Sequence, residues 1–240
     1  GKMMNGLPGL FAGMAVGVVI SVIVAFLVGL PTLRLKGDYL AIATLGVAEI
    51  IRVAVTNMKI TNGAAGISGV PLTNTWTITY IALVVTTILI LNYTFSSAGR
   101  ATYAVLQDEI AAESMGVQVT KYKILAFVLG AATASIGGTL SATTLGAVTP
   151  SDFTFMKSIE VLIIVVFGGI GSFTGSFVAA ILLGIINLVL QPFGQLRMII
   201  YAVALILIMI FRPGGLLGTW EFKLGDFKFS KKKETKESGK

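Results

Sequence analysis

Several apolar stretches, each long enough to cross a lipid bilayer as a helix, constrain this chain more than any other feature. Four of them lie at 7–30, 39–56, 75–91 and 124–145, and about 20 apolar residues span the roughly 30 Å hydrocarbon core. Only 12% of the 240 residues are charged, against about 25% in an average soluble domain. A β-barrel would show alternating strands of about ten residues instead. The sequence therefore predicts an all-α fold, a polytopic transmembrane helical bundle.

Small residues distinguish two of these stretches. In the first, Gly9, Gly13 and Gly17 recur every four residues, which predicts a close-packing face for a neighbouring helix. The stretch at 124–145 is rich in Gly, Ala, Ser and Thr. Because small residues let helix backbones approach closely in membranes, we expect this helix to pack inside the bundle.

A further apolar stretch, residues 159–190, is too long for a single span. As one helix it would measure roughly 48 Å, and a glycine-rich sequence lies in its middle. We predict two short helices joined through a break, with Gly168, Gly169 and Gly171 as candidate residues of a translocation pathway. Broken helices at membrane depth line cavities or are buried in protein. A plain tight turn between two short helices remains the alternative.

The distribution of basic residues predicts the side of the membrane on which each loop lies. Seven of the 18 Lys and Arg residues follow Leu217, so we divide the chain into a transmembrane domain at 1–218 and a basic, disordered tail at 219–240. A last span is expected at 196–211. With the tail in the cytoplasm, alternation puts 13 basic residues inside, four outside and Arg52 within a span, as the positive-inside rule requires. The loop at 57–74 then lies outside.

Neither catalysis nor nucleic-acid binding is indicated. The chain contains no Cys and no His, which excludes disulfides and the usual His or Cys metal sites. It also lacks the G-x-x-x-x-G-K-[ST] motif for binding ATP. The net charge is +7, and many of the basic residues lie in the tail, which indicates contact with membrane lipid rather than nucleic acid. We therefore expect no enzyme activity and no cofactor bound by this chain.

The longest strongly polar run within the apolar part of the chain is Gln107–Gly116. We predict a short cytoplasmic helix at about 107–116, capped by Asp108 at its N-terminus and ended by Gly116. Glu109 and Glu113 share one face, and a second face consists of small and apolar residues. Such a helix suits insertion into the groove of a soluble motor protein. An ordinary solvated helix between two spans fits the same spacing.

Glu49 and Arg52 are the charged pair that we expect within a span. They lie three residues apart, and therefore on one helix face. Charges at membrane depth are costly and usually face a cavity or a partner, so the pair is a candidate pathway or gate. A self-neutralising structural pair near a helix end, with Arg52 extending outward, is the other interpretation.

Five segments together resemble the branched-chain amino acid ABC importer permeases. They are GDYLAIATLGVAEIIRV (37–53), TNGAAGISGVP (61–71), DEIAAESMGV (108–117), FGGIGSFTGSFVAAILLG (167–184) and FRPGGLLG (211–218). The resemblance extends over almost all of the chain and is closest to the M-type of the two paired permease subunits. Members of this family usually carry further apolar spans before the point at which this chain begins, so we expect the chain to lack them.

The resemblance implies a role for the polar segment. In the family the corresponding loop is the coupling helix that contacts the ATPase, and here the role falls on Glu109, Ala111, Ala112 and Gly116. Ile110 separates the Glu from the Ala-Ala pair, which are adjacent in the wider importer pattern. The Leu-Pro that usually follows is also absent.

The resemblance also implies a function. The chain is expected to be a permease subunit of an ATP-driven importer of branched-chain or related amino acids in the prokaryotic plasma (inner) membrane. Its partners would be a second permease subunit, two cytoplasmic ATPases that use ATP and magnesium, and an extracytoplasmic binding protein. An autonomous secondary transporter or channel for a small solute is the alternative.

Overall fold

The computed structural model describes most of the apolar part of the chain. It covers residues 6–35, 37–72, 76–169 and 171–190, together with the single residues 194, 199, 200, 203 and 206. Apart from those single positions, the predicted span at 196–211 lies outside the described residues, as does the predicted tail at 219–240. The chain forms two compact units, Gly1–Phe155 and Met156–Lys240, which are described separately.

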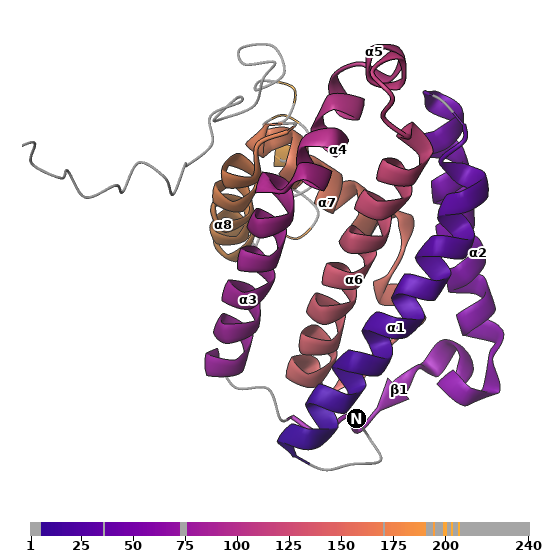
Figure 1. The fold of residues 1–240 in the computed structure, drawn as a ribbon. Helices are drawn as coiled ribbons and strands as arrows, with labels where there is room; N and C mark the ends of the chain where they lie inside the picture. The colour runs from indigo at the N-terminus through magenta and orange to yellow at the C-terminus, as the bar shows by residue number, and fades with distance from the viewer. Residues whose placement is uncertain are drawn as a thin grey trace, which may run out of the picture. The chain divides into compact units, whose positions relative to one another are not determined.

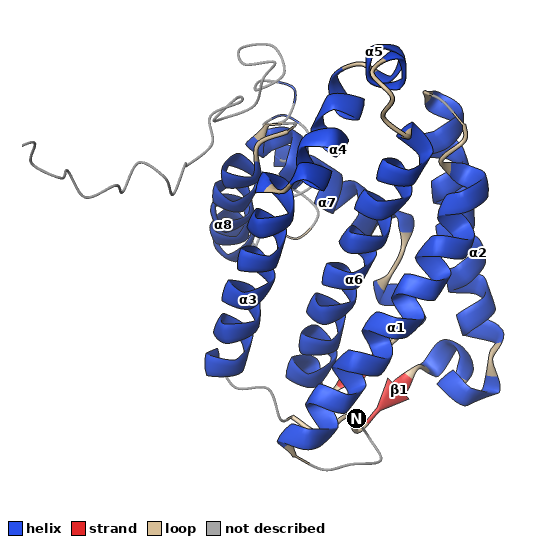
Figure 2. Cartoon of the chain, viewed as in Figure 1, coloured by secondary structure: helices blue, strands red, loops and turns tan. Residues whose placement is uncertain are grey.

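Long helices make up most of the first unit (Figures 1 and 2). In chain order they are α1 (Leu7–Thr32), α2 (Asp38–Asn57), α3 (Trp76–Phe95), α4 (Ser97–Gln107), α5 (Glu109–Ser114) and α6 (Val119–Leu145). Within the described residues, α1, α2, α3, α6 and the later α8 (Phe173–Leu190) are long and apolar enough to span a membrane. The predicted helical membrane fold is confirmed, and the four spans expected before residue 146 correspond to α1, α2, α3 and α6.

The interface between α1 and α6 organises the first unit. The two helices lie side by side over much of their length (Figure 1). A Cβ added to Gly17 would lie 3.0 Å from Ser135 Oγ, and one added to Gly29 would lie 3.3 Å from the Phe127 ring. The Ser21 hydroxyl donates a hydrogen bond to the carbonyl of Ala131 at 2.8 Å. Small residues thus bring the two backbones close together, as predicted for Gly17 and for α6.

A compact polar cap closes the end of the first unit opposite α5 (Figure 1). Strand β1 (Ile67–Ser68) pairs antiparallel with β2 (Ala147–Val148), and the short 3-10 helices η1 (Lys59–Thr61), η2 (Gly63–Ala65) and η3 (Pro150–Asp152) surround this pair. A Cβ on Gly66 would lie 2.3 Å from the Val148 carbonyl oxygen, so only glycine fits there. The described part of the loop after α2, up to Leu72, thus has a defined backbone conformation, as predicted.

The second unit contains a helical hairpin. Helix α7 (Phe155–Gly168) ends at a four-residue turn, and α8 begins at Phe173. Phe167, Ala179 and Leu183 are buried together, with Ile163, Ile164 and Ile186 packed around them. The predicted pair of short helices is confirmed, and the short connection between them matches the tight turn that was the alternative to a break lining a cavity. We expected the first of these helices to begin near Ile159, but it begins four residues earlier and is only 14 residues long.

Candidate functional site

Helix α5 is a short element whose two ends are closed by its own residues. One carboxylate oxygen of Asp108 accepts hydrogen bonds from the backbone N–H groups of Ile110 and Ala111, at 2.8 and 3.0 Å. At the other end Gly116 has φ +82°. Its N–H donates to the Glu113 carbonyl at 2.9 Å, and the Val117 N–H donates to the Ala112 carbonyl at 3.0 Å. This pair of bonds is a Schellman motif, so both predicted boundary residues are confirmed.

One face of α5 is open and the other is fastened to the unit. Ile110 and Met115 are 73% and 84% exposed, and Ala111 and Ser114 are also exposed. Ala112 is buried, with 5% of its surface exposed. Glu109 forms an ion pair with Lys123 in the first turns of α6. Of the residues carried over from the family pattern, Ala111 therefore lies on the free face, whereas Ala112 and Glu109 hold the helix in place.

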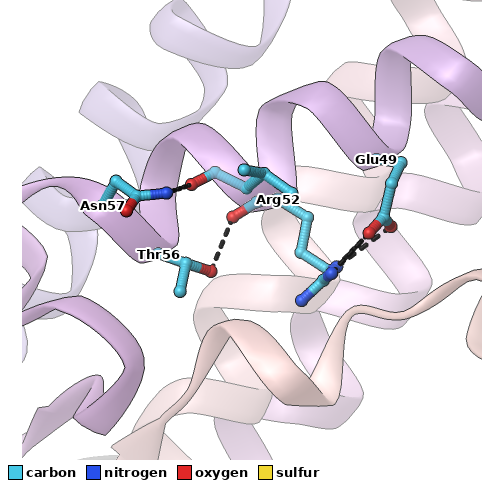
Figure 3. A network of polar contacts seen from close by, with 5 residues as sticks. Glu49, Arg52, Thr56 and Asn57 are labelled. Carbon is cyan, nitrogen blue, oxygen red and sulfur yellow. Dashed lines mark hydrogen bonds and ion pairs between the residues drawn. The ribbon is translucent and has the colours of Figure 1, made fainter.

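The charge pair predicted within a span is present on α2 (Figure 3). Arg52 Nε lies 3.1 and 3.0 Å from the two carboxylate oxygens of Glu49. The hydroxyl of Thr56 donates to the Arg52 carbonyl at 2.8 Å, and the Asn57 amide donates to the Val53 carbonyl at 2.8 Å. The helix end is thus held by its own polar side chains.

The pair lies off the side of α2 that faces α1. Val47, Ala48 and Ile51 line a groove shared with α1. Glu49 and Arg52 directly follow Ala48 and Ile51 and so point about 100° away from them round the helix. Half of the Glu49 side chain, 49%, is exposed, against 27% for Arg52. Arg52 therefore neutralises Glu49 on the same helix, and within the described part of the chain half of the Glu49 side chain remains exposed.

The glycines of the break form a tight turn. Gly169 and Gly171 have φ +117° and +92°, a region that side chains rarely adopt. A Cβ on Gly168 would lie 2.5 Å from the Gly175 backbone, so α7 and α8 touch backbone to backbone there. Buried Ser172 caps α8, since its hydroxyl accepts the Gly175 N–H at 3.0 Å. The turn requires glycine at 169 and 171, and the close backbone contact requires it at 168. A role of these three glycines in a pathway stays a prediction.

The sequence analysis did not predict two features of the structure, an ion pair on α7 and the helix α4. Lys157 and Glu160 form an ion pair at 2.9 Å on α7, and Glu160 lines a small groove of the hairpin together with Asn187. Helix α4 was also missed. Its signal was Ser96, whose hydroxyl accepts the Gly99 N–H at 3.1 Å as an N-terminal cap.

Two grooves adjoin α6. The first has a volume of about 850 Å³ and lies among α4, α5, α6 and the neighbouring ends of α1 and α2. The second has a volume of about 460 Å³ and lies between α3 and α6, lined by Thr79, Thr86, Thr133, Ser141 and Thr144 among others. Hydroxyl groups on helices of membrane-spanning length can line a path for a polar solute.

Helices long enough to span, a capped polar helix at one end and an ordered cap at the other define a polytopic helical membrane protein. The model of the family "Branched-chain amino acid transport system / permease component" matches residues 2–211. The chain belongs to this family, as its motifs predicted.

Individual relatives agree with the family assignment. The chain is 36% identical over 233 residues to the high-affinity branched-chain amino acid transport system permease protein LivM of Salmonella typhimurium, covering 82% of this chain and 55% of the relative. It is 37% identical over 227 residues to LivM of Escherichia coli K12, covering 80% and 53%. Similarity to the permease protein LivH of E. coli K12 is lower, 30% over 145 residues, covering 60% of this chain and 46% of LivH.

The chain spans about half the length of the LivM proteins it matches. No solved structure matches it at a significant level.

Proposed function

We propose that this chain is a membrane-spanning permease subunit of an ATP-driven importer that moves branched-chain or related amino acids into the cytoplasm. The observation that carries the proposal is α5, a capped helix with a free face that lies between two membrane spans of a family permease. Relatives named as branched-chain amino acid transport permeases, among them both LivM and LivH, support the substrate class and a second permease partner.

In this proposal α5 transmits force from a cytoplasmic ATPase. Its free face, with Ile110 and Met115 projecting, enters a groove of the ATPase, which uses ATP and magnesium. The Glu109–Lys123 ion pair connects α5 to α6, so movement of α5 is passed to a helix that crosses the membrane. An extracytoplasmic binding protein delivers the amino acid to the opposite side.

The location of α5 follows from the same proposal. It lies at one end of the first unit and β1 at the other (Figure 1), with helices of membrane-spanning length between them. We place α5 and the tail in the cytoplasm of a prokaryotic cell and the β1 cap outside. Since the chain lacks cysteine, single cysteines at Ser68 and Ser114 should react with an impermeant thiol reagent from opposite sides. Reaction of both from one side would overturn this topology.

Ala111→Arg tests the coupling role. The substitution puts a long charged side chain on the free face of α5 without touching either cap, so we expect membrane insertion to persist while ATPase association and leucine uptake fall at least about tenfold. Thr120→Arg, an equal change at an exposed position at the start of α6, is the control and should retain uptake. Normal ATPase association and uptake by the Ala111→Arg complex would contradict the proposal.

The alternative of an autonomous secondary transporter or channel makes a different prediction. Uptake would then persist in vesicles that contain this chain but no ATPase, and it would respond to an ion or proton gradient. Measuring leucine uptake with and without ATP in vesicles holding the assembled complex separates the two functions.

A further inference from the structure

One face of α6 contributes residues to both grooves beside it, and this face with its two grooves is called the track. Lys123, Ala126, Gly130 and Ala134 line the groove next to α5, and Gly137, Ser141 and Thr144 line the groove next to α3. These residues follow one another at intervals of three or four, so they share one face of α6. From 123 to 144 the face extends over roughly 32 Å, the thickness of the hydrocarbon core.

The track is open within the described first unit. A Cβ added to Gly130 or Gly137 would meet no heavy atom within 4 Å, although residues of α4 and α3 line the two grooves. A volume of about 460 Å³ beside α3 falls in the roughly 300–1,000 Å³ range of small-molecule sites.

The chemistry of the outer groove selects for a class of solute. Thr86 on α3 donates its hydroxyl proton to the Ala82 and Leu83 carbonyls, at 2.8 and 3.0 Å. Thr133 on α6 donates to the Leu129 and Gly130 carbonyls, at 3.1 and 2.9 Å. Each proton is used by its own helix, so each oxygen offers lone pairs as an acceptor. Both residues lie near the middle of their helices.

We propose that this face of α6, together with Thr86 of α3, is the translocation track of the chain and takes amino acids with apolar side chains. Acceptor oxygens suit the N–H groups of an ammonium, and Leu83, Ile136 and Leu140 supply apolar wall. The inner end of the track reaches the Glu109–Lys123 ion pair at α5, so movement of α5 acts directly on its exit. The inference rests on the proposed import function and deepens it by placing the route.

Thr133 and Ser135 offer a matched test. They lie two residues apart at the same depth of α6, but Ser135 faces Gly17 of α1, whereas Thr133 lines the groove. In vesicles holding the assembled transporter, Thr133→Cys should react with a charged, water-soluble thiosulfonate at least about tenfold faster than Ser135→Cys. Saturating leucine should slow the reaction of the Thr133→Cys variant, and modification of its thiol should abolish uptake.

Gly137→Cys provides a second position should Thr133→Cys fail to insert, because it lies on the same open face. Equal, slow labelling at 133 and 135, or at 137 and 135, would show that lipid or another helix fills the track and would overturn the inference. Fast labelling unaffected by leucine would overturn the assigned solute class. Absence of leucine uptake by the unmodified complex would instead contradict the proposed import function.

Discussion

The two faces of α6 are built from the same kinds of small residue, yet the fold uses them in opposite ways. Ala131, Ser135 and Thr139 meet α1 at close range, with a hydrogen bond from Ser21 to the Ala131 carbonyl. Gly130 and Gly137 on the other face have open space beside them. Small residues in a membrane helix can therefore either admit a neighbouring backbone or leave room for a solute. Only the position of the neighbours distinguishes these uses.

The largest effect is expected from a leucine at the contact between α1 and α6, compared with a leucine on the open face of α6. Gly17→Leu forces a side chain against Ser135 and Thr139, so we expect a loss of roughly 1–3 kcal/mol in the free energy of unfolding from overpacking. Gly137→Leu enters open space and should change stability by no more than about 0.5 kcal/mol. Unfolding of the purified chain in detergent, followed by circular dichroism, measures both.

Uptake by the assembled transporter then separates the two faces by function. Gly137→Leu should assemble normally but transport poorly, since its side chain fills the proposed track. Gly17→Leu should lose assembly and transport together. A stable Gly17→Leu chain, or a Gly137→Leu transporter with normal uptake, would show that the two faces do not differ as described.

The sequence predicted the positions and ends of the helices better than it predicted which helix faces pack together. Apolar runs located the spans, and Asp108 and Gly116 marked the ends of α5, because capping depends on local hydrogen bonds. The break near Gly169 was predicted because a helix through it would be too long for the membrane. Which face of α6 packs on α1 depends on residues that are far apart in the sequence, such as Ser21 of α1 and Ala131 of α6, which are 110 positions apart. No local pattern encodes that choice.

The candidate site shows the same division. Glu49 and Arg52 were recognisable because they are three residues apart on one helix. The Glu109–Lys123 pair joins two helices, and its spacing of 14 residues carries no periodic signal. Ala112 could not be separated from Ala111 in the sequence, although one is buried and the other exposed.

The Glu49–Arg52 pair allows the same kind of test on α2, whose exposed side carries an ion pair instead of the small residues found on α6. Arg52→Met leaves the Glu49 carboxylate without its partner at membrane depth, so we expect reduced amounts of folded chain in the membrane. Glu49→Leu combined with Arg52→Met removes both charges and should restore the folded amount. Immunoblotting of membrane fractions measures these differences, which we expect to be smaller than that of Gly17→Leu because Glu49 is half exposed.

Uptake by the double variant decides what the pair does. A folded, ATPase-bound complex with impaired uptake would mean that the pair lines the route or a gate. Uptake equal to that of the unmodified transporter would mean that it is architectural, and that the exposed carboxylate faces a neighbouring subunit or lipid headgroups.

Ser21→Ala gives the smallest expected effect and tests how much polar contact adds to the packed face. The substitution removes the hydrogen bond from α1 to the Ala131 carbonyl at 2.8 Å but leaves the glycine contacts intact. Hydrogen bonds between membrane helices contribute only about 0.6 kcal/mol on average, so we expect a loss of that order in the free energy of unfolding. Ser114→Ala is the matched control, because the Ser114 hydroxyl bonds within its own helix to the Ile110 carbonyl at 2.8 Å. A loss several times larger for Ser21→Ala would mean that this hydrogen bond, rather than close backbone approach, holds α1 against α6. Equal stability of both variants and the unmodified chain would attribute the interface to packing alone.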